Sequence, residues 1–445
     1  MADLIHKKRG LTSFQIIILG FAGVILVGAL LLMLPISTKN SIVTPLNEAL
    51  FTSTSAVCVT GLVVQDTATY WSAFGQSIIL VLIQIGGLGV ITVAASFALL
   101  SGRKISLMQR STMQEAIAAP KVGGIVRLTF FVLKVTFLIE LLGALVMMPT
   151  FIHDFGAKGI WMSFFHSISA FCNAGFDIMG TEGAKFASIT SYLGNSVINV
   201  TIMILIVIGG IGFLTWEDVC TKKLYFKRYR MQSKVILVTS ALLILLPAVF
   251  FFFVDFADMP MKDRVLGSLF QAVTPRTAGF NTADLTAMTG AGQAIIIVLM
   301  LIGGSPGSTA GGMKTTTFAV LLATALSTFR RKEDTQIFKR RVDHSVVRNA
   351  ATILMMYIVL FFGGAVVISV AEGLPFSTCL YETASAIGTV GLTLGITPQL
   401  GTLSQCVLMV LMFFGRVGGL TLIYAALSGT GKKLSKLPQE RITVG

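Results

Sequence analysis

Four glycine-containing segments recur along the chain at nearly equal intervals. They cover residues 54–62, 168–176, 272–280 and 384–392, and their shared glycines lie 114, 104 and 112 residues apart in a chain of 445. Three of them share the frame Ser-Ala, four further residues, glycine, and then Leu or Phe. An internal repeat constrains a fold more than local propensity does, because every copy forms the same supersecondary unit. The chain is therefore predicted to be a tandem array of four similar units.

Each unit contains two long apolar segments with a short one between them. A helix of about 20 residues crosses a hydrocarbon core of about 30 Å, whereas one of about ten to twelve residues does not. The chain has 54% hydrophobic and only 12% charged residues, which excludes an ordinary soluble enzyme with about 25% charged residues. The long segments are 14–34, 74–100, 128–149, 192–216, 235–254, 292–328, 349–371 and 402–428, and the short ones are 45–56, 159–170, 262–273 and 375–386.

The short segments are interpreted as re-entrant pore helices, which a membrane tolerates where protein or water surrounds the backbone. The predicted fold is an all-α membrane protein of four tandem parallel units around one pseudo-fourfold pore. Each unit has a first long helix (M1), a pore helix (P) and a second long helix (M2), giving eight transmembrane and four pore helices. The predicted boundaries are 1–13 for a cytoplasmic N-terminus, 14–102, 103–220, 221–332 (with an interrupted M2) and 333–431 for the repeats, and 432–445 for a cytoplasmic tail.

The positive charges give the orientation. Lys and Arg number 34 against 20 Asp and Glu, a formal charge of +14, and 25 of the 34 fall in segments that eight crossings place on one side. Cytoplasmic loops are enriched in Lys and Arg, so both termini of this multi-pass cell-membrane protein are predicted to be cytoplasmic. An even number of crossings makes the units parallel, whereas inverted-repeat transporters relate units with odd numbers of crossings.

The four glycine loops are predicted to form a cation selectivity filter. A ring of backbone carbonyls replaces the hydration shell of an alkali cation without a formal charge. Glycine reaches the required backbone angles at little steric cost. The predicted potassium-binding residues are Val57, Cys58, Val59, Thr60, Gly61, Phe171, Cys172, Asn173, Ala174, Gly175, Arg276, Thr277, Ala278, Gly279, Gly388, Thr389, Val390 and Gly391.

The glycines align with the first glycine of the potassium-channel filter, most visibly in Thr389-Val390-Gly391. Over essentially its whole length the chain resembles the Trk/Ktr/HKT family of cation uptake proteins, and within it the KtrB-type membrane subunits of bacterial Ktr potassium uptake systems. Glycine at all four filter positions implies selectivity for K+ in this family. The resemblance also implies a homodimer in membrane lipid, a KtrA-like octameric ring of cytoplasmic nucleotide-binding subunits as partner, and Na+ as a coupling or activating ion. No residue pattern shows sodium coupling.

The M2 segment of the third repeat contains five glycines and a proline. Such residues break helices, so a loop is predicted inside the membrane below the filter. In the family this stretch is an intramembrane gate, and the alternative is a structural kink. A nucleotide-binding loop is rejected because Met313 separates the last glycine from the lysine. The predicted gate residues are Gly303, Gly304, Ser305, Pro306, Gly307, Ser308, Thr309, Ala310, Gly311, Gly312 and Lys314.

Three charged residues at membrane depth have separate predictions. Arginine near the bilayer centre costs about 2.5–3.5 kcal/mol on insertion scales, so Arg416 is predicted to line the pore as a barrier bonded to gate-loop carbonyls. Arg276 is predicted to brace the filter through neighbouring carbonyls or Glu side chains. For Glu140, an ion pair with Lys134 or a dimer contact is favoured over a role in coupling. The Gly-Gly-x-Gly sequences at 86–89 and 209–212 are interpreted as sites of close helix packing.

Taken together, these patterns predict a non-enzyme that moves potassium inward, with K+ as its only metal ion. The alternative is a secondary transporter of a different cation or small solute, which would need inverted repeats and a site rich in side chains. A membrane-embedded enzyme would need clustered His, Asp or Cys, but the four histidines are scattered. The five cysteines include no CxxC pair, so they support neither a zinc site nor a disulfide framework.

Overall fold

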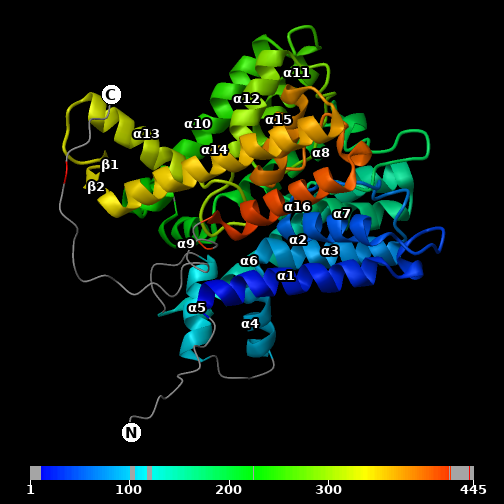
Figure 1. Cartoon of the computed structure of the whole chain (residues 1–445), viewed down its shortest axis with the longest axis horizontal. Helices are drawn as coiled ribbons and strands as arrows, with labels where there is room; N and C mark the ends of the chain where they lie inside the picture. Colours follow the sequence, from blue (N-terminus) through cyan, green and yellow to red (C-terminus); the bar gives the residue numbers. More distant parts are fainter. Residues whose placement is uncertain are drawn as a thin grey trace.

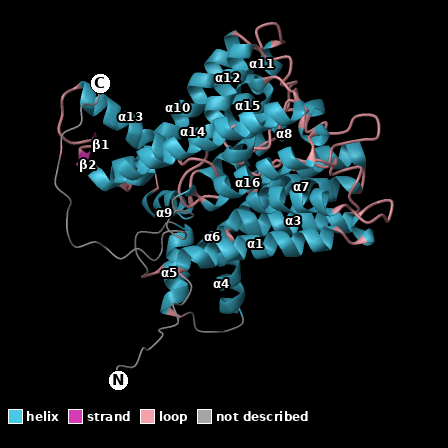
Figure 2. Cartoon of the chain, in the orientation of Figure 1, coloured by secondary structure: helices cyan, strands magenta, loops and turns pink. Residues whose placement is uncertain are grey.

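A computed structural model describes residues 12–100, 106–117, 123–223, 225–419, 421 and 440. In this part the chain forms sixteen α-helices, four short 3-10 turns and one two-stranded hairpin (Figure 1). Helices account for nearly all of the ordered elements (Figure 2), so the prediction of a helical protein is confirmed. The predicted tail at 432–445, apart from residue 440, and residues 1–11 of the predicted N-terminal segment lie outside the described residues.

The helices follow the order that the repeats predict. The first repeat contains α1 (Ser13–Leu32), α2 (Leu46–Cys58), α3 (Ala73–Leu88) and α4 (Val90–Leu100), and the second contains α6 (Ile125–Phe155), α7 (Lys158–Phe171), α8 (Ser196–Gly210) and α9 (Phe213–Lys222). The third contains α10 (Met231–Phe253), α11 (Met261–Val273), α12 (Gly290–Leu301) and α13 (Thr315–Phe329), and the fourth contains α14 (His344–Glu372), α15 (Phe376–Gly388) and α16 (Thr402–Val417). Ahead of α6 in the second repeat lies α5 (Leu107–Ile117), and ahead of α14 in the fourth lies the antiparallel hairpin of β1 (Gln336–Ile337) and β2 (Arg340–Arg341).

The first long helix of every repeat is continuous. By length and composition α1, α6, α10 and α14 suffice to cross a membrane, and only 22–33% of the residues in their most apolar windows are buried. Their remaining apolar residues face outward, as expected where lipid replaces water. At the start of α1, Thr12 accepts a hydrogen bond from the backbone of Gln15, whose side chain accepts one from the backbone of Thr12. This capping box satisfies two helix-end donors that would otherwise lack partners.

The second long segments of the first, second and third repeats are broken, which corrects the prediction that only the third is interrupted. Helices α3 and α4 meet at 97°, and α8 and α9 meet at 100°. The bends lie at Gly89 and Gly212, whose φ values are +86° and +92°, and α16 ends before Gly418 with φ +88°. These left-handed conformations favour glycine because a side chain would be strained there. The Gly-Gly-x-Gly sequences therefore mark helix breaks as well as close packing.

The third repeat has the longest interruption, as predicted. Helix α12 ends at Leu301 and α13 begins at Thr315, so the glycine-rich stretch between them is not helical. A single parallel bridge between Ile302 and Met313 closes its base. We call residues 303–314 the gate segment. Most of its residues are buried, so hydrogen bonds from neighbouring elements must satisfy its backbone.

The short helices α2, α7, α11 and α15 occupy the positions predicted for pore helices. Proline is the residue before the first helical turn in α2, α11 and α15. Its fixed φ suits a helix start, and an N–H group at this position would have no acceptor within the helix. Each short helix packs against the long helix before it. Their C-terminal halves are buried and lead directly into the four glycine loops.

Candidate cation pathway

The four predicted glycines lie together in a ring, although each is more than 100 residues from the next in sequence. A β-carbon on any of them would collide with a carbonyl oxygen of the following repeat. In order around the ring, the pairs are Gly61 with Ala174 O, Gly175 with Ala278 O, Gly279 with Val390 O and Gly391 with Thr60 O. The repeats therefore follow one another around the ring in sequence order, and the loops approach too closely for any side chain at these positions.

The loop backbones share an unusual conformation. All four glycines have positive φ, between +66° and +94°. The residue two positions earlier is also left-handed in each loop, and these residues are Val59, Asn173, Thr277 and Thr389, with φ between +51° and +75°. Such angles are rare outside glycine and asparagine, and they persist only where the surrounding structure imposes them. The same strained pattern therefore occurs in all four loops.

Hydroxyl groups brace the loops from behind. The backbone N–H of Gly61 donates to Ser55 Oγ at 3.1 Å, and that of Gly391 donates to Ser385 Oγ at 3.0 Å. In the second loop Ser169 Oγ donates to Phe176 O at 2.7 Å, and in the third Thr274 Oγ1 donates to Phe280 O at 2.5 Å. The hydroxyl therefore satisfies loop backbone groups in every repeat. The C-terminal ends of α2, α7, α11 and α15 lead into the four loops, and the C-terminus of a helix carries a partial negative charge.

The gate segment lies against the second and fourth glycine loops. Thr309 Oγ1 donates to Phe171 O at 3.0 Å and accepts from Asn173 Nδ2 at 2.9 Å. A β-carbon on Gly311 would collide with Thr389 Oγ1 of the fourth loop. The backbone N–H groups of Ser305 and Thr309 donate to the carbonyls of Gly210 and Gly209 at the end of α8, at 2.9 and 3.2 Å. The segment is thus held directly beside the residues that precede the glycine ring.

Arg416 lies near the end of α16 and contacts both the gate segment and the end of α3. Its guanidinium donates to Thr309 O in the gate segment, to Gly86 O, and to Gly87 O at 3.0 Å at the end of α3. The predicted bond between this arginine and a gate-loop carbonyl is thus present in the structure. Lys314 Nζ donates to Ala310 O at 2.8 Å within the gate segment. Neither Arg416 nor Lys314 has an ion-pair partner among the residues that the structure describes.

Sequence comparison identifies the family. Residues 7–433 match the family model TrkH, described as a cation transport protein. The chain belongs to the TrkH cation transport family. It is 38% identical over 432 residues to Ktr system potassium uptake protein B of Bacillus subtilis, with 95% of each chain covered. It is 36% identical to the potassium/sodium uptake protein NtpJ of Enterococcus hirae, with 99% of this chain and 100% of that protein covered. The predicted resemblance to KtrB-type proteins is confirmed.

A solved structure supports the same fold. The crystal structure of the potassium transporter TrkH from Vibrio parahaemolyticus superposes with a TM-score of 0.73 at 18% sequence identity, and the match covers 95% of this chain and 86% of that chain. The Ktr system potassium uptake protein B of Vibrio alginolyticus is 33% identical, with 97% of this chain and 94% of that protein covered. These relatives are transporters of cations, in agreement with the prediction that the chain is not an enzyme.

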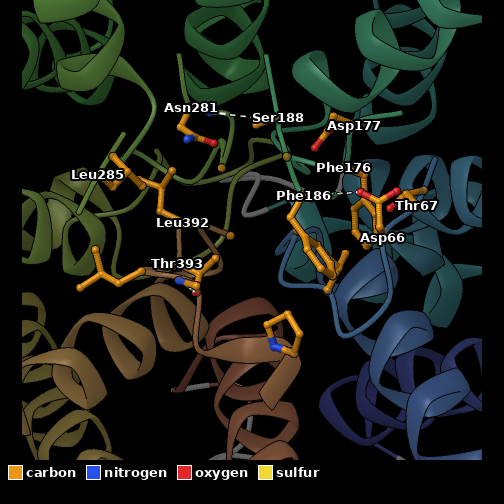
Figure 3. Close-up of a pocket in the computed structure, with 18 of the residues that line it drawn as sticks. Asp66, Thr67, Phe176, Asp177, Phe186, Ser188, Asn281, Leu285, Leu392 and Thr393 are labelled. Carbon is orange, nitrogen blue, oxygen red and sulfur yellow. Dashed lines mark hydrogen bonds between the residues drawn. The ribbon is translucent and has the colours of Figure 1, made fainter. Parts of the chain in front are cut away.

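On the side of the ring opposite the gate segment, this TrkH-family chain has an outer cavity of about 250 Å³ (Figure 3). All four ring glycines line it, together with the carboxylates of Asp66, Asp177 and Asp284. Asp66 accepts from the backbone N–H groups of Thr69 at 2.8 Å and Phe186 at 2.7 Å, which hold its side chain at the cavity wall. The sequence prediction missed all three carboxylates. A signal existed, because Asp66 and Asp284 each follow their ring glycine by five residues.

Two predictions about charged residues are wrong. Arg276 braces the filter through neither carbonyls nor Glu side chains: its guanidinium donates to Ser240 Oγ on α10 at 3.0 Å, and its Nε has no partner among the described residues. Its side chain turns away from the ring because α10 supplies the nearest acceptor, so only its backbone remains in the loop. Glu140 does not pair with Lys134, since Lys134 is exposed on the outer face of α6 and Glu140 is only 4% exposed.

Glu140 instead belongs to a buried cluster behind the second glycine loop. It accepts from Gln84 Nε2 at 3.0 Å and lies 3.8 Å from Cys172 Sγ. Its burial also argues against the dimer contact considered from sequence. Cys172 packs against the end of α3, where a β-carbon on Gly87 would lie 2.7 Å from Cys172 Sγ. The small residues of this helix end therefore leave room for the second loop to approach.

Proposed function

We propose that this chain takes up potassium across the cell membrane through a filter of four glycine loops. The ring of close backbone contacts between successive repeats is the observation that carries the proposal. Carbonyls placed by such a ring can replace the hydration shell of K+. The pore-helix C-termini supply partial negative charge on one side, and the carboxylates of the outer cavity supply more. The names of the relatives, which describe potassium uptake and in one case potassium and sodium uptake, support the choice of ion.

The proposed architecture is eight membrane crossings in four parallel units, with repeat boundaries at 14–102, 103–220, 221–332 and 333–431. Four continuous helices and the bent pairs α3–α4 and α8–α9 account for up to six crossings by length and composition. We assign the other two to α12 with α13 and to α16 with the residues that follow it. The distribution of Lys and Arg supports cytoplasmic termini.

The gate segment is proposed to block the pathway below the filter, with Arg416 as an electrostatic barrier. Its hydrogen bonds to the second filter loop and to Arg416 support a gate more than a simple kink, which would need no contact with the filter. A homodimer, a cytoplasmic nucleotide-binding ring and a dependence on Na+ are further proposals. They rest on the relatives, two of which are named as members of Ktr systems.

The experiment that tests the proposal is a flux assay with the purified chain in liposomes. Potassium entry above that of empty liposomes is expected, first without sodium and then with Na+ on the outer side. A rise in flux with added Na+ would support activation or coupling. Flux of an organic solute without any potassium flux would instead support the alternative of a secondary transporter for another substrate.

The outer cavity predicts a dependence of uptake on external pH. Burial, helped by the nearby charge of Asp66, raises the pKa of Asp177 to about 7, although a hydrogen bond from the backbone of Met179 acts in the opposite direction. Above this pKa Asp177 is ionised and attracts cations, whereas below it the side chain is neutral. Uptake at low external K+ is therefore expected to fall as external pH drops through about 7.

Two variants test this pH dependence. Asp177→Asn is expected to remove the step near pH 7 and to leave uptake at its low-pH value. Asp284→Asn is the matched control, because hydrogen bonds from Thr286 lower the pKa of Asp284 and keep it ionised across this range. This control is expected to reduce uptake at every pH without moving the midpoint. An unchanged pH profile in Asp177→Asn would contradict the assignment.

A further inference from the structure

An apolar groove of about 670 Å³ lies on the third repeat, away from the cation pathway. It is lined by α10, α12 and α13 and by Ile337 and Phe338 of the hairpin. The break in the third M2 creates the groove, because α13 does not continue the line of α12 but packs against α10 and α14 (Figure 1). Among the described residues that line it, only Thr239 has a polar side chain, so the groove suits a hydrocarbon occupant.

The dimensions of the groove match one lipid chain. Along α10 it extends from Val235 to Pro247, about 18 Å at a rise of 1.5 Å per residue. One leaflet of a bilayer contributes about half of a hydrocarbon core of about 30 Å. Leu242 and Leu246 on its wall are 51% and 67% exposed, so the groove is open to the surrounding lipid. A single acyl chain of one leaflet therefore fits its length.

The charges at one end of the groove indicate what kind of lipid headgroup it would bind. Phe338, at this end, lies 6.4 Å from the ring of Phe226, which brings the hairpin beside the turn before α10. Two basic segments thus meet at the mouth of the groove. The exposed cations in them include Lys227, Arg228, Arg330, Arg331, Lys332, Lys339, Arg340 and Arg341, and Lys234 is half-buried.

Few carboxylates offset this charge. Asp334 lies 3.6 Å from Arg341 and 3.7 Å from His344, and the neighbouring Glu333 is exposed. The mouth therefore keeps a large excess of positive charge. Each Lys or Arg close to an anionic membrane surface contributes about 1 kcal/mol of attraction, so the mouth suits an anionic phosphate headgroup.

We propose that the groove and its basic mouth form a binding site for one anionic phospholipid. An acyl chain lies between α10 and α13, and the phosphate headgroup contacts the basic residues around Phe338. Ile302 lines the groove and also pairs with Met313, so the occupant contacts the base of the gate segment. A lipid bound in the groove is therefore expected to alter transport. This effect on transport rests on the proposed function, whereas the binding of the lipid does not.

Native mass spectrometry of the purified full chain tests the binding. The chain is extracted from vesicles of equal parts phosphatidylglycerol and phosphatidylcholine. The wild type is expected to retain phosphatidylglycerol about fivefold or more over phosphatidylcholine, since about 1 kcal/mol corresponds to about fivefold in affinity. Lys339→Glu with Arg340→Glu is expected to abolish this preference. Ala319→Trp, which fills the groove between α13 and α10, is expected to remove the bound lipid of either kind.

Matched variants separate this site from general contact with the membrane. Arg110→Glu with Arg127→Glu makes the same charge change at exposed positions of the second repeat, and Leu142→Trp adds a Trp to the exposed face of α6. Both are expected to retain phosphatidylglycerol as the wild type does. Equal retention of the two lipids by the wild type, or equal losses in the controls, would overturn the proposal.

Two further results distinguish the occupant and the link to transport. A second copy of the chain could fill the groove instead of a lipid. In that case Ala319→Trp converts a dimer to a monomer in the same spectra, and Lys339→Glu with Arg340→Glu binds lipid as the wild type does. This result also overturns the proposal. Potassium flux is then measured in vesicles with and without phosphatidylglycerol. Selective lipid binding in a chain that moves no potassium would count against the proposed function and leave the lipid site standing.

Discussion

Gly61→Ser is expected to abolish the preference for K+ over Na+ and to reduce total uptake. Gly61 has φ +89°, a conformation that side chains rarely adopt, and a β-carbon there would collide with the carbonyl oxygen of Ala174 and lie 3.2 Å from the α-carbon of Gly175. The first and second filter loops must therefore separate. A change of about 1.4 kcal/mol in relative ion binding reduces selectivity about tenfold, and a displaced carbonyl ring is expected to exceed this.

The measurement is competitive uptake of K+ and Na+ by the purified chain in liposomes. Gly23→Ser is a suitable control, because Gly23 lies in α1 of the same repeat and a β-carbon there would meet nothing within 4 Å. The control is expected to keep wild-type selectivity and rate. If Gly61→Ser preserves the preference for K+, the glycine ring is not the element that selects the ion.

Arg416→Ala is expected to raise the rate of potassium entry. The substitution removes hydrogen bonds from the guanidinium to Thr309 O, Gly86 O and Gly87 O, so it removes the link from the gate segment to α3 and leaves the backbone hydrogen bond from Gly312 to Gly415 O of α16. A hydrogen bond to a charged group contributes about 1.5–3 kcal/mol, and loss of one such bond shifts a closed-to-open equilibrium by about tenfold or more. Removal of a positive charge beside the filter loops acts in the same direction.

Flux is compared among three chains in liposomes of one composition. Arg416→Lys keeps the charge but loses the planar group that reaches several carbonyls, so an intermediate rate is expected. Arg348→Ala removes an exposed arginine of α14 and is expected to leave the rate unchanged. Wild-type flux in Arg416→Ala would refute the role of this residue as a barrier, and lower flux would indicate that it supports the open pathway.

Several elements could be predicted because their signals are local. The apolar segments place the helices, and the start of each short helix agrees with the structure within a few residues. The gate segment was predicted from its glycines and Pro306, since a helix cannot continue through them. The breaks at Gly89 and Gly212 have a similar local signal but were interpreted only as packing, because short glycine motifs serve both purposes.

Side-chain partners could not be predicted in the same way. Arg276 was assigned to the filter because its position in the third loop is known from sequence, but the nearest acceptor, Ser240, belongs to a different helix. Glu140 and Lys134 are close in sequence yet lie on different faces of α6. The direction of a side chain depends on which faces of neighbouring helices pack together, and this information is not local.

The sequence by itself determined the number of repeats, the positions of the glycine loops and the likeness to cation uptake proteins. These features depend on periodicity, segment length and short motifs, which are properties of the chain before it folds. Only the tertiary structure decided the order of loops around the ring, the carboxylates of the outer cavity and the contacts of the gate segment. Arg416 and Gly86 are 330 residues apart in sequence, and they meet because helices of the first, third and fourth repeats pack around one axis beneath the ring.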